Sequence, residues 1–223
     1  PLVVDFVVTS TAPVVNSLLN FPALALADSV DMDNDSLTDM AEELFQTDPA
    51  LPDSDNDSYS DAHEIFYLYN PAGKEPMKII DGGTVKEYNN PVFNYAFYYP
   101  INWAVGNTKE DYRDILFSTL SGDNIEVMAV EKDGNQDFAT WFLQNVPSEQ
   151  LSDYLPFESR FGATGWERND KMVYFIVAPG RVYILAYHTS ETKVVNYRIV
   201  LNMFARSFML PTSSGNMIPS ELF

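Results

Sequence analysis

The sequence contains no cysteine among its 223 residues and has only two histidines, His63 and His188. The absence of cysteine excludes disulfide bonds, thiolate nucleophiles and cysteine-ligated zinc sites. Basic residues are also scarce, with 13 Lys and Arg against 32 Asp and Glu and a formal net charge of −19. Such a charge argues against binding to nucleic acid or to an anionic membrane surface.

Recognisable catalytic motifs are absent too. The sequence holds no P-loop, no G-x-G-x-x-G or G-x-S-x-G stretch and no H-E-x-x-H pair. No apolar run reaches the roughly 18 residues that a membrane-spanning helix needs. Apolar residues make up 46% and aromatic residues 14% of the chain, which is enough for a folded core. The sequence therefore predicts a folded protein that is not an enzyme.

The acidic residues concentrate between positions 28 and 64, where no Lys or Arg occurs. A twelve-residue pattern occurs twice there, and its second copy starts 22 residues after the first. Each copy has carboxylates at positions 1, 3, 5, 9 and 12. The first copy supplies Asp31, Asp33, Asp35, Asp39 and Glu42, and the second supplies Asp53, Asp55, Asp57, Asp61 and Glu64. A solvated acidic linker would not repeat five positions in register.

This spacing matches the oxygen ligands of an EF-hand-type calcium loop, in which position 7 binds through its backbone carbonyl. Leu37 and Tyr59 occupy position 7 of the two copies. A calcium ion needs roughly six to eight oxygens at about 2.3–2.6 Å. Without the ion, the carboxylates of one loop would repel one another. The sequence therefore predicts about two bound calcium ions, one in each copy.

The pattern D-x-D-x-D-x-x-x-D-x-x-E, followed by T-D-P and P-D-S-D-x-D, resembles a pair of bacterial thrombospondin type 3-like repeats over about residues 28–66. The resemblance implies calcium coordination by the twelve residues named above, in a rigid spacer of a secreted or cell-surface protein. Ser36 and Ser58 depart from the pattern, because such loops usually carry glycine at position 6. A non-glycine residue with positive φ costs on the order of 1 kcal/mol, so we expect a lower calcium affinity. A dockerin is a weaker match, because both copies close with Glu and acidic helices follow.

Composition divides the chain into five segments. They are an apolar N-terminal segment at 1–27, the repeats at 28–69, a linker at 70–76, a larger domain at 77–210 and a tail at 211–223. Residues 2–9 are predicted to form a strand, which could join the chain's own sheet or dock on a neighbour. Ala25-Leu26-Ala27 resembles a signal-peptidase site, but no basic region precedes it. Because the chain begins at Pro1 rather than Met, an upstream signal or membrane anchor is an open alternative.

The larger domain is predicted to be α+β, an antiparallel sheet flanked by helices. Strands are expected at 77–80, 84–88, 92–99, 114–120, 124–131, 172–178 and 182–188. Hairpin turns are expected at Asp81-Gly82-Gly83 and at Pro179-Gly180. Helices are expected at 136–144, 148–154 and 192–206, and at 38–46 and 60–69 in the repeats. Residues 162–165 are expected to form a loop.

The segment Tyr95-Ala96-Phe97-Tyr98-Tyr99-Pro100-Ile101-Asn102-Trp103 resembles the opening strand of PsbP-like domains, and Ser207-Phe208 resembles their closing residues. The resemblance covers about residues 77–210. It implies an α-β-α sandwich that acts as a non-catalytic adaptor or assembly module, and it implies no particular biological setting.

Few side chains could form an active site. The acid pairs Asp111/Asp114 and Glu149/Asp153 could serve a glycosidase, and His188 could act as a base. Solvated or strand-edge positions explain each of them more simply. The aromatic stretch 93–99 could line a ligand groove, but core packing is the default for such a strand.

The leading hypothesis is a non-catalytic, secreted or cell-surface calcium-binding protein, in which calcium stiffens the repeats and so positions a binding or assembly domain. One alternative is a subunit of an extracellular assembly or filament that docks or self-associates through residues 1–20. A second alternative is a calcium-stabilised hydrolase of glycans or the cell wall.

Overall fold

The computed structural model describes residues 19–22, 26–74, 76–191 and 193–211. The strand expected at residues 2–9, most of the expected docking segment 1–20 and most of the tail lie outside these ranges. Within the described ranges, no helix combines the length and the apolar character needed to cross a bilayer.

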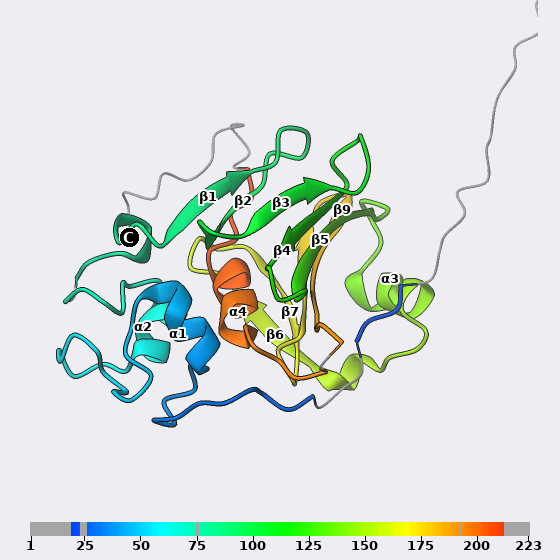
Figure 1. The fold of residues 1–223 in the computed structure, drawn as a ribbon. Coiled ribbons are helices and arrows are strands. Elements are labelled where there is room, and N and C mark those ends of the chain that lie inside the picture. The colour runs from blue at the N-terminus through cyan, green and yellow to red at the C-terminus, as the bar shows by residue number, and fades with distance from the viewer. Residues whose placement is uncertain (1–18, 23–25, 75, 192, 212–223) are drawn as a thin grey trace, which may run out of the picture.

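A seven-stranded antiparallel sheet forms the centre of the larger domain (Figure 1). Its strands lie in the order β3-β4-β5-β9-β8-β7-β6. Their bounds are β3 Ala104–Asn107, β4 Asp114–Ser118, β5 Asn124–Glu131, β6 Tyr154–Glu158, β7 Thr164–Arg168, β8 Val173–Ala178 and β9 Arg181–His188. A separate ribbon pairs β1 (Val85–Asn89) with β2 (Ala96–Pro100). These strands and their flanking helices confirm the predicted α+β class.

The central strands are apolar on both faces, since alternate residues of a strand point to opposite sides of the sheet. In β9, Tyr183, Leu185 and Tyr187 belong to one buried cluster, whereas Val182, Ile184 and Ala186 belong to another. Helix α3 (Phe138–Asn145) covers the second cluster, and helix α4 (Arg198–Arg206) covers the first. The sheet is therefore packed between helices on its two sides.

Helix α4 is the element that joins the sheet to the repeats. Residues 200–205 of this helix are all buried, as expected for a helix that is covered on every side. The helix contacts β9 and β2 and also helix α2 of the repeats. In Figure 1 it lies between the sheet and the two short helices α1 and α2. The calcium-loop repeats are thus packed onto the same core as the larger domain.

The two helices of the repeats, α1 (Asp39–Phe45) and α2 (Asp61–Tyr67), form where the sequence predicts them. Each begins at a hydroxyl cap, since Thr38 Oγ1 accepts the Ala41 N–H and Ser60 Oγ accepts the His63 N–H, both at 3.3 Å. Such caps satisfy backbone donors that a first helical turn leaves free. Both helices end after two turns at a residue in the left-handed conformation.

The hairpin expected around Asp81-Gly82-Gly83 is wrong. Residues 79–81 form a single 3-10 turn, and β1 pairs with β2 instead. The real hairpin turn is held by Asn90, whose side-chain oxygen accepts the Val92 and Phe93 N–H groups at 3.0 and 2.9 Å. Because those residues are part of the turn, β2 starts at Ala96 rather than at residue 92.

The helix expected at 148–154 is also wrong. Only residues 151–153 form a 3-10 turn, and Tyr154 begins the edge strand β6. The tyrosine is buried against Phe142 of α3, with ring centroids 5.2 Å apart. Packing under α3 therefore overrides the local helical pattern.

The first residues of α4 and β7 differ from expectation, and β3 was not expected at all. Helix α4 starts at Arg198 rather than at 192, because Val195 pairs with the chain near Asp28: the Val195 N–H donates to Ala27 O at 2.9 Å. The loop expected at 162–165 ends early, since Thr164 and Gly165 belong to β7. A Cβ at Gly165 would lie 1.8 Å from the Phe175 carbonyl oxygen, so only glycine fits between these strands.

Candidate metal centre

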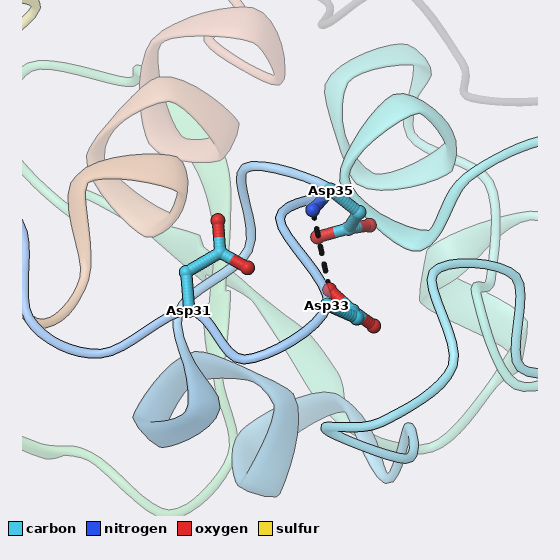
Figure 2. Close-up of side chains that lie close together, drawn as sticks. All are labelled: Asp31, Asp33 and Asp35. Carbon is cyan, nitrogen blue, oxygen red and sulfur yellow. Dashed lines mark hydrogen bonds between the residues drawn. The ribbon is translucent and has the colours of Figure 1, made fainter.

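The first acidic loop, residues 31–42 (loop 1), is folded by its own carboxylates. Asp31 accepts the N–H groups of Asn34 and Ser36 at 2.8 and 3.0 Å. Asp33 accepts the Asp35 N–H at 3.2 Å, the bond drawn in Figure 2. Carboxylate oxygens of Asp31, Asp33 and Asp35 lie within 4.8 Å of one another. Three carboxylates this close could hold a metal ion between them.

The second acidic loop, residues 53–64 (loop 2), repeats this arrangement. Asp53 accepts the N–H groups of Asp57 and Ser58 at 3.1 and 2.9 Å. Carboxylate oxygens of Asp53, Asp55 and Asp57 again lie within 4.8 Å of one another. Ser36 and Ser58 both have positive φ, 83° and 86°, so the serines at position 6 do adopt the conformation that normally favours glycine.

Glu42, at position 12 of loop 1, is buried beside the three aspartates. Its side chain is 0% exposed, and neither of its carboxylate oxygens has a hydrogen-bond partner among the described residues. Burial, with repulsion from Asp33, Asp35, Asp61 and Asp39, raises the pKa of Glu42 to about 7. A buried carboxylate without a partner is strongly destabilising. A divalent cation in loop 1 would supply that partner.

Burial also disfavours the charged form of other acids in the loops. Burial raises the pKa of Asp55, and repulsion from Asp57 and Asp53 adds to the shift. Both carboxylate oxygens of Asp55 are buried without a hydrogen-bond partner in the described part of the chain. Glu64, the position-12 residue of loop 2, is fully buried. A hard cation with oxygen ligands fits this donor set, so the two acidic triplets are compatible with bound metal.

The acids at position 9 lie differently from those at positions 1, 3 and 5. Asp39 accepts the Met32 N–H at 2.9 Å, and Asp61 accepts the Ser54 N–H at 2.9 Å. Each carboxylate thus ties the start of its loop to the first turn of its helix. Neither belongs to the converging triplets. In calcium loops of this type, position 9 often reaches the ion through a water.

The two loops are joined through Asp35. Its second carboxylate oxygen accepts the N–H of Ala62, in the first turn of α2, at 2.9 Å. Burial raises the pKa of Asp61, with Asp35 and Asp33 adding to the shift. Neither loop alone predicts this hydrogen bond. The short distance of 22 residues between the starts of the two copies is a sequence signal that the loops could pack against each other.

The structure therefore brings together positions 1, 3 and 5 of each loop, places position 9 at the loop closure and buries position 12. Leu37 and Tyr59 hold position 7. The role of these twelve residues as ligands stays a prediction.

Of the side chains considered for catalysis, Asp153 lies in the 3-10 turn at 151–153, and the others contact a group that can carry the opposite charge. Asp111 pairs with Arg113 at 2.9 Å, and Asp114 pairs with Lys109. Glu149 pairs with the buried Arg168 at 2.7 Å. His188 lies 3.1 Å from Glu126 on the neighbouring strand. Ion pairs thus account for Asp111, Asp114 and Glu149, and a side-chain contact with Glu126 accounts for His188.

The aromatic stretch near β2 packs in the core, as expected. Tyr95 and Phe97 are both buried, and their rings stack with Phe208 at centroid distances of 5.2 and 5.8 Å. They fill the space between the β1–β2 ribbon, the sheet and α4.

No family model matches the chain. Collagenase ColT of Clostridium tetani is 37% identical over 170 residues, a match that covers 70% of this chain and 16% of the collagenase. The chain thus spans well under two thirds of the curated relative that it matches. The solution structure of cyanobacterial PsbP from Synechocystis has a TM-score of 0.39 and 14% identity, covering 57% of this chain and 93% of that chain.

A crystal structure from Bacteroides thetaiotaomicron also has a TM-score of 0.39, with 10% identity, and covers 59% of this chain and 50% of that chain. Similarities at this level carry no argument about function. The α+β class rests on the strands and helices of the chain itself.

Proposed function

We propose that this chain is a non-catalytic calcium-binding structural module. Each loop holds one calcium ion through its five carboxylates and the carbonyl at position 7. The ligands are Asp31, Asp33, Asp35, Leu37, Asp39 and Glu42 in loop 1, and Asp53, Asp55, Asp57, Tyr59, Asp61 and Glu64 in loop 2. The resemblance of these loops to thrombospondin type 3-like repeats supports the same assignment.

The observation that carries this proposal is the state of Glu42. A fully buried carboxylate whose two oxygens have no hydrogen-bond partner among the described residues, next to three converging aspartates, is stabilised by a cation. Calcium fits better than magnesium, because six or more protein oxygens suit its larger and more flexible coordination shell. The ions hold α1 and α2, and α2 packs against α4 of the larger domain.

The direct test is a calorimetric calcium titration of the protein after chelation and dialysis. We expect two bound ions, and weaker binding of magnesium. Calcium at about 100 times its dissociation constant should stabilise the folded state by about 2.7 kcal/mol per site and raise Tm by about 5–10 °C per site. Identical melting curves in calcium and in EGTA would contradict the proposal.

A matched pair of double variants separates ligand loss from loss of charge. The variant Asp33→Asn with Asp55→Asn should lose most of the calcium-induced rise in Tm. The control variant Asp81→Asn with Glu191→Gln removes the same amount of charge from exposed positions outside the loops and should keep it. An equal response of the two variants would show that the effect of calcium is not specific to the loops.

Secretion or a cell-surface location is part of the proposal. Loops that lack glycine at position 6 suit the high calcium concentration outside cells better than the cytosol. The docking of residues 1–20 on a partner or on a second copy remains the alternative role. Removal of residues 1–12 should then lower the oligomeric state in solution, as measured by light scattering, and an unchanged state would contradict this alternative.

A hydrolytic role is the second alternative, and one observation favours looking for it. The relative with 37% identity is named a collagenase. Under this alternative the chain is itself a calcium-stabilised hydrolase of glycans or the cell wall, whereas under the non-catalytic role it corresponds to a part of such a protein that lies outside the catalytic part. Incubation of the purified chain with collagen, polysaccharide and peptidoglycan should release no product, and calcium-dependent cleavage by this chain alone would contradict the non-catalytic role.

A further inference from the structure

Val30, Met32 and Met40 are exposed apolar residues at the start of loop 1, and we call them the apolar triad. Their exposed fractions are 67%, 61% and 39%. Asp39 holds the three together, since its N–H donates to the Val30 carbonyl at 3.0 Å and its carboxylate accepts the Met32 N–H at 2.9 Å. Met40 follows Asp39 in the chain. Closure of loop 1 therefore gathers the triad on one part of the surface.

Loop 2 shows that the fold of such a loop does not require these apolar side chains. Its Asp61 makes the same two bonds, to the Pro52 carbonyl at 3.1 Å and from the Ser54 N–H at 2.9 Å. The positions of the triad are occupied there by Pro52, Ser54 and Ala62, and Ala62 is only 6% exposed. The same loop thus forms without large apolar residues, so the triad serves a purpose other than folding of the loop.

The triad lies outside the hydrophobic core. None of its residues belongs to the two buried clusters, or to the half-buried residues packed against them, in the described part of the chain. Leu26 and Leu44, which flank the triad in sequence, do pack against the main cluster. Single exposed apolar residues are common, but three gathered together are typical of an interaction surface. The triad therefore fits a surface that a partner covers.

The charge around the triad favours a basic partner. Residues 28–64 contain no Lys or Arg, and ten of their carboxylates are the proposed calcium ligands. Two calcium ions neutralise fewer than half of these ten charges, so the repeats stay acidic when both loops are filled. Glu43, one turn beyond Met40 in α1, is exposed and adds to this charge. Lys and Arg of a partner are attracted here, whereas a second copy of this chain, with its net charge of −19, is repelled.

A cavity of about 530 Å³ borders the triad, since Asp31, between Val30 and Met32 in the chain, is part of its lining. Its walls come from loop 1, from α4, from α2 and from the turn between β7 and β8. The charged residues of the lining are three aspartates and two basic residues, Asp28, Asp31, Asp170, Lys171 and Arg198. Because this balance is negative, the cavity does not favour an acidic partner either.

Methionine suits a docking surface of this kind, and two of the three residues of the triad are methionines. The unbranched thioether side chain is flexible and polarisable, so it adapts to apolar side chains of different shapes. The triad can therefore supply apolar contact, while the surrounding carboxylates select the partner by its charge.

We propose that the apolar triad is the docking surface for a basic amphipathic segment of a partner protein. Apolar side chains of the segment pack on Val30, Met32 and Met40, and its Lys and Arg residues face the carboxylates around them. Because Asp39 closes loop 1 and is a proposed calcium ligand, this inference rests on the proposed function.

The test is a calorimetric titration of the full chain, in calcium, with the synthetic peptide acetyl-LKKLLKLLKKLLKL-amide, which is basic and amphipathic. Two comparison peptides change one property each. Acetyl-LEELLELLEELLEL-amide reverses the charge, and acetyl-SKKSSKSSKKSSKS-amide removes the apolar side chains. We expect each of them to bind at least about tenfold more weakly than the first peptide. Equal affinity for the first peptide and either comparison peptide, or no binding of the first at millimolar concentration, would overturn the proposal.

Two double variants locate the binding surface. Met32→Ser with Met40→Ser should weaken the binding of the basic amphipathic peptide by at least about tenfold. The matched control is Leu51→Ser with Val92→Ser, because these residues are 48% and 52% exposed and lie outside the triad. The control should bind the peptide as tightly as the unchanged protein does. Equal losses in the two variants would overturn the proposal.

A calcium titration of the same samples separates this inference from the proposed function. Two bound ions, together with unchanged peptide affinity in Met32→Ser with Met40→Ser, would overturn the docking surface alone. Failure of the unchanged protein to bind calcium would overturn the proposed function. Light scattering tests the other occupant, since a dimer that the methionine variant loses would mean that a second copy covers the triad, and would overturn the basic partner.

Discussion

Leu37 of loop 1 is fully buried, whereas Tyr59 at the same position of loop 2 is 43% exposed. Leu37 belongs to the main buried cluster with Phe204 of α4. Tyr59 instead stacks on His63 at the surface, with ring centroids 5.4 Å apart. The two loops share their acids and their turns, but they differ in what the protein places around them.

The two loops also differ in the hydrogen bonds that they and their neighbouring residues make to the rest of the chain. Next to loop 1, the Thr38 hydroxyl donates to the Asn196 carbonyl of the larger domain, and the Ser29 N–H donates to the Val195 carbonyl at 3.0 Å. Loop 2 has a long contact from Lys74 Nζ to the Asn56 carbonyl, at 3.4 Å, and its helix α2 contacts α4. Loop 1 is therefore tied to the larger domain through the loop itself, and loop 2 through α2.

The largest expected difference is between Leu37→Ala and Tyr59→Ala. Truncation of a fully buried leucine costs about 2–5 kcal/mol, whereas loss of a largely exposed tyrosine ring should cost under about 1 kcal/mol. Denaturant unfolding in saturating calcium measures both. Equal costs would mean that loop 1 is no more firmly anchored than loop 2.

The next largest expected effect is at Glu42, where the variant Glu42→Gln should lower stability in calcium and raise it in EGTA. In calcium, Glu42→Gln should weaken one of the two sites by about tenfold or more, which is about 1.4 kcal/mol. In EGTA, the same variant should be more stable than the unchanged protein, because the buried charge without a partner is gone. Thermal melting in the two conditions measures this reversal.

Glu64→Gln is the matched variant in loop 2. It should weaken the other site by a similar factor, because Glu64 is as fully buried as Glu42. If Glu42→Gln lowers stability equally with and without calcium, Glu42 is a structural residue rather than a ligand.

The smallest expected effect tests what the loops have in common. Ser36→Gly and Ser58→Gly each relieve a left-handed serine, and relief of about 0.5–1 kcal/mol corresponds to about a two- to fivefold gain in calcium affinity. Because the φ angles of the two serines are nearly equal, the gains should be similar. Calorimetry of each variant measures them, and a gain in only one loop would show that tertiary anchoring also sets affinity.

Elements governed by neighbouring residues were predictable from the sequence. The helices α1 and α2 follow from hydroxyl caps one residue before each helix. Strand β5 has the bounds expected for it, and β8 pairs with β9 across Pro179-Gly180 as expected. In each case the turn or cap lies within a few residues of the element that it defines.

Elements governed by distant partners were not predictable. The order β5-β9-β8 places strands side by side that are separated by about fifty residues of chain. Tyr154 begins a strand because α3 covers it, and α4 begins late because Val195 pairs near Asp28. Local patterns carry no information about which surface will be available for packing.

The sequence by itself determined the twelve-residue spacing of the acids and the turns that bring three carboxylates together in each loop, because the bonds involved reach only a few residues along the chain. Tertiary structure alone decided that Glu42 is buried, that Asp35 reaches Ala62 across the two copies, and that a cavity forms between loop 1 and α4. Burial depends on segments far apart in sequence, and burial makes a charged carboxylate without a partner costly enough to favour a nearby cation.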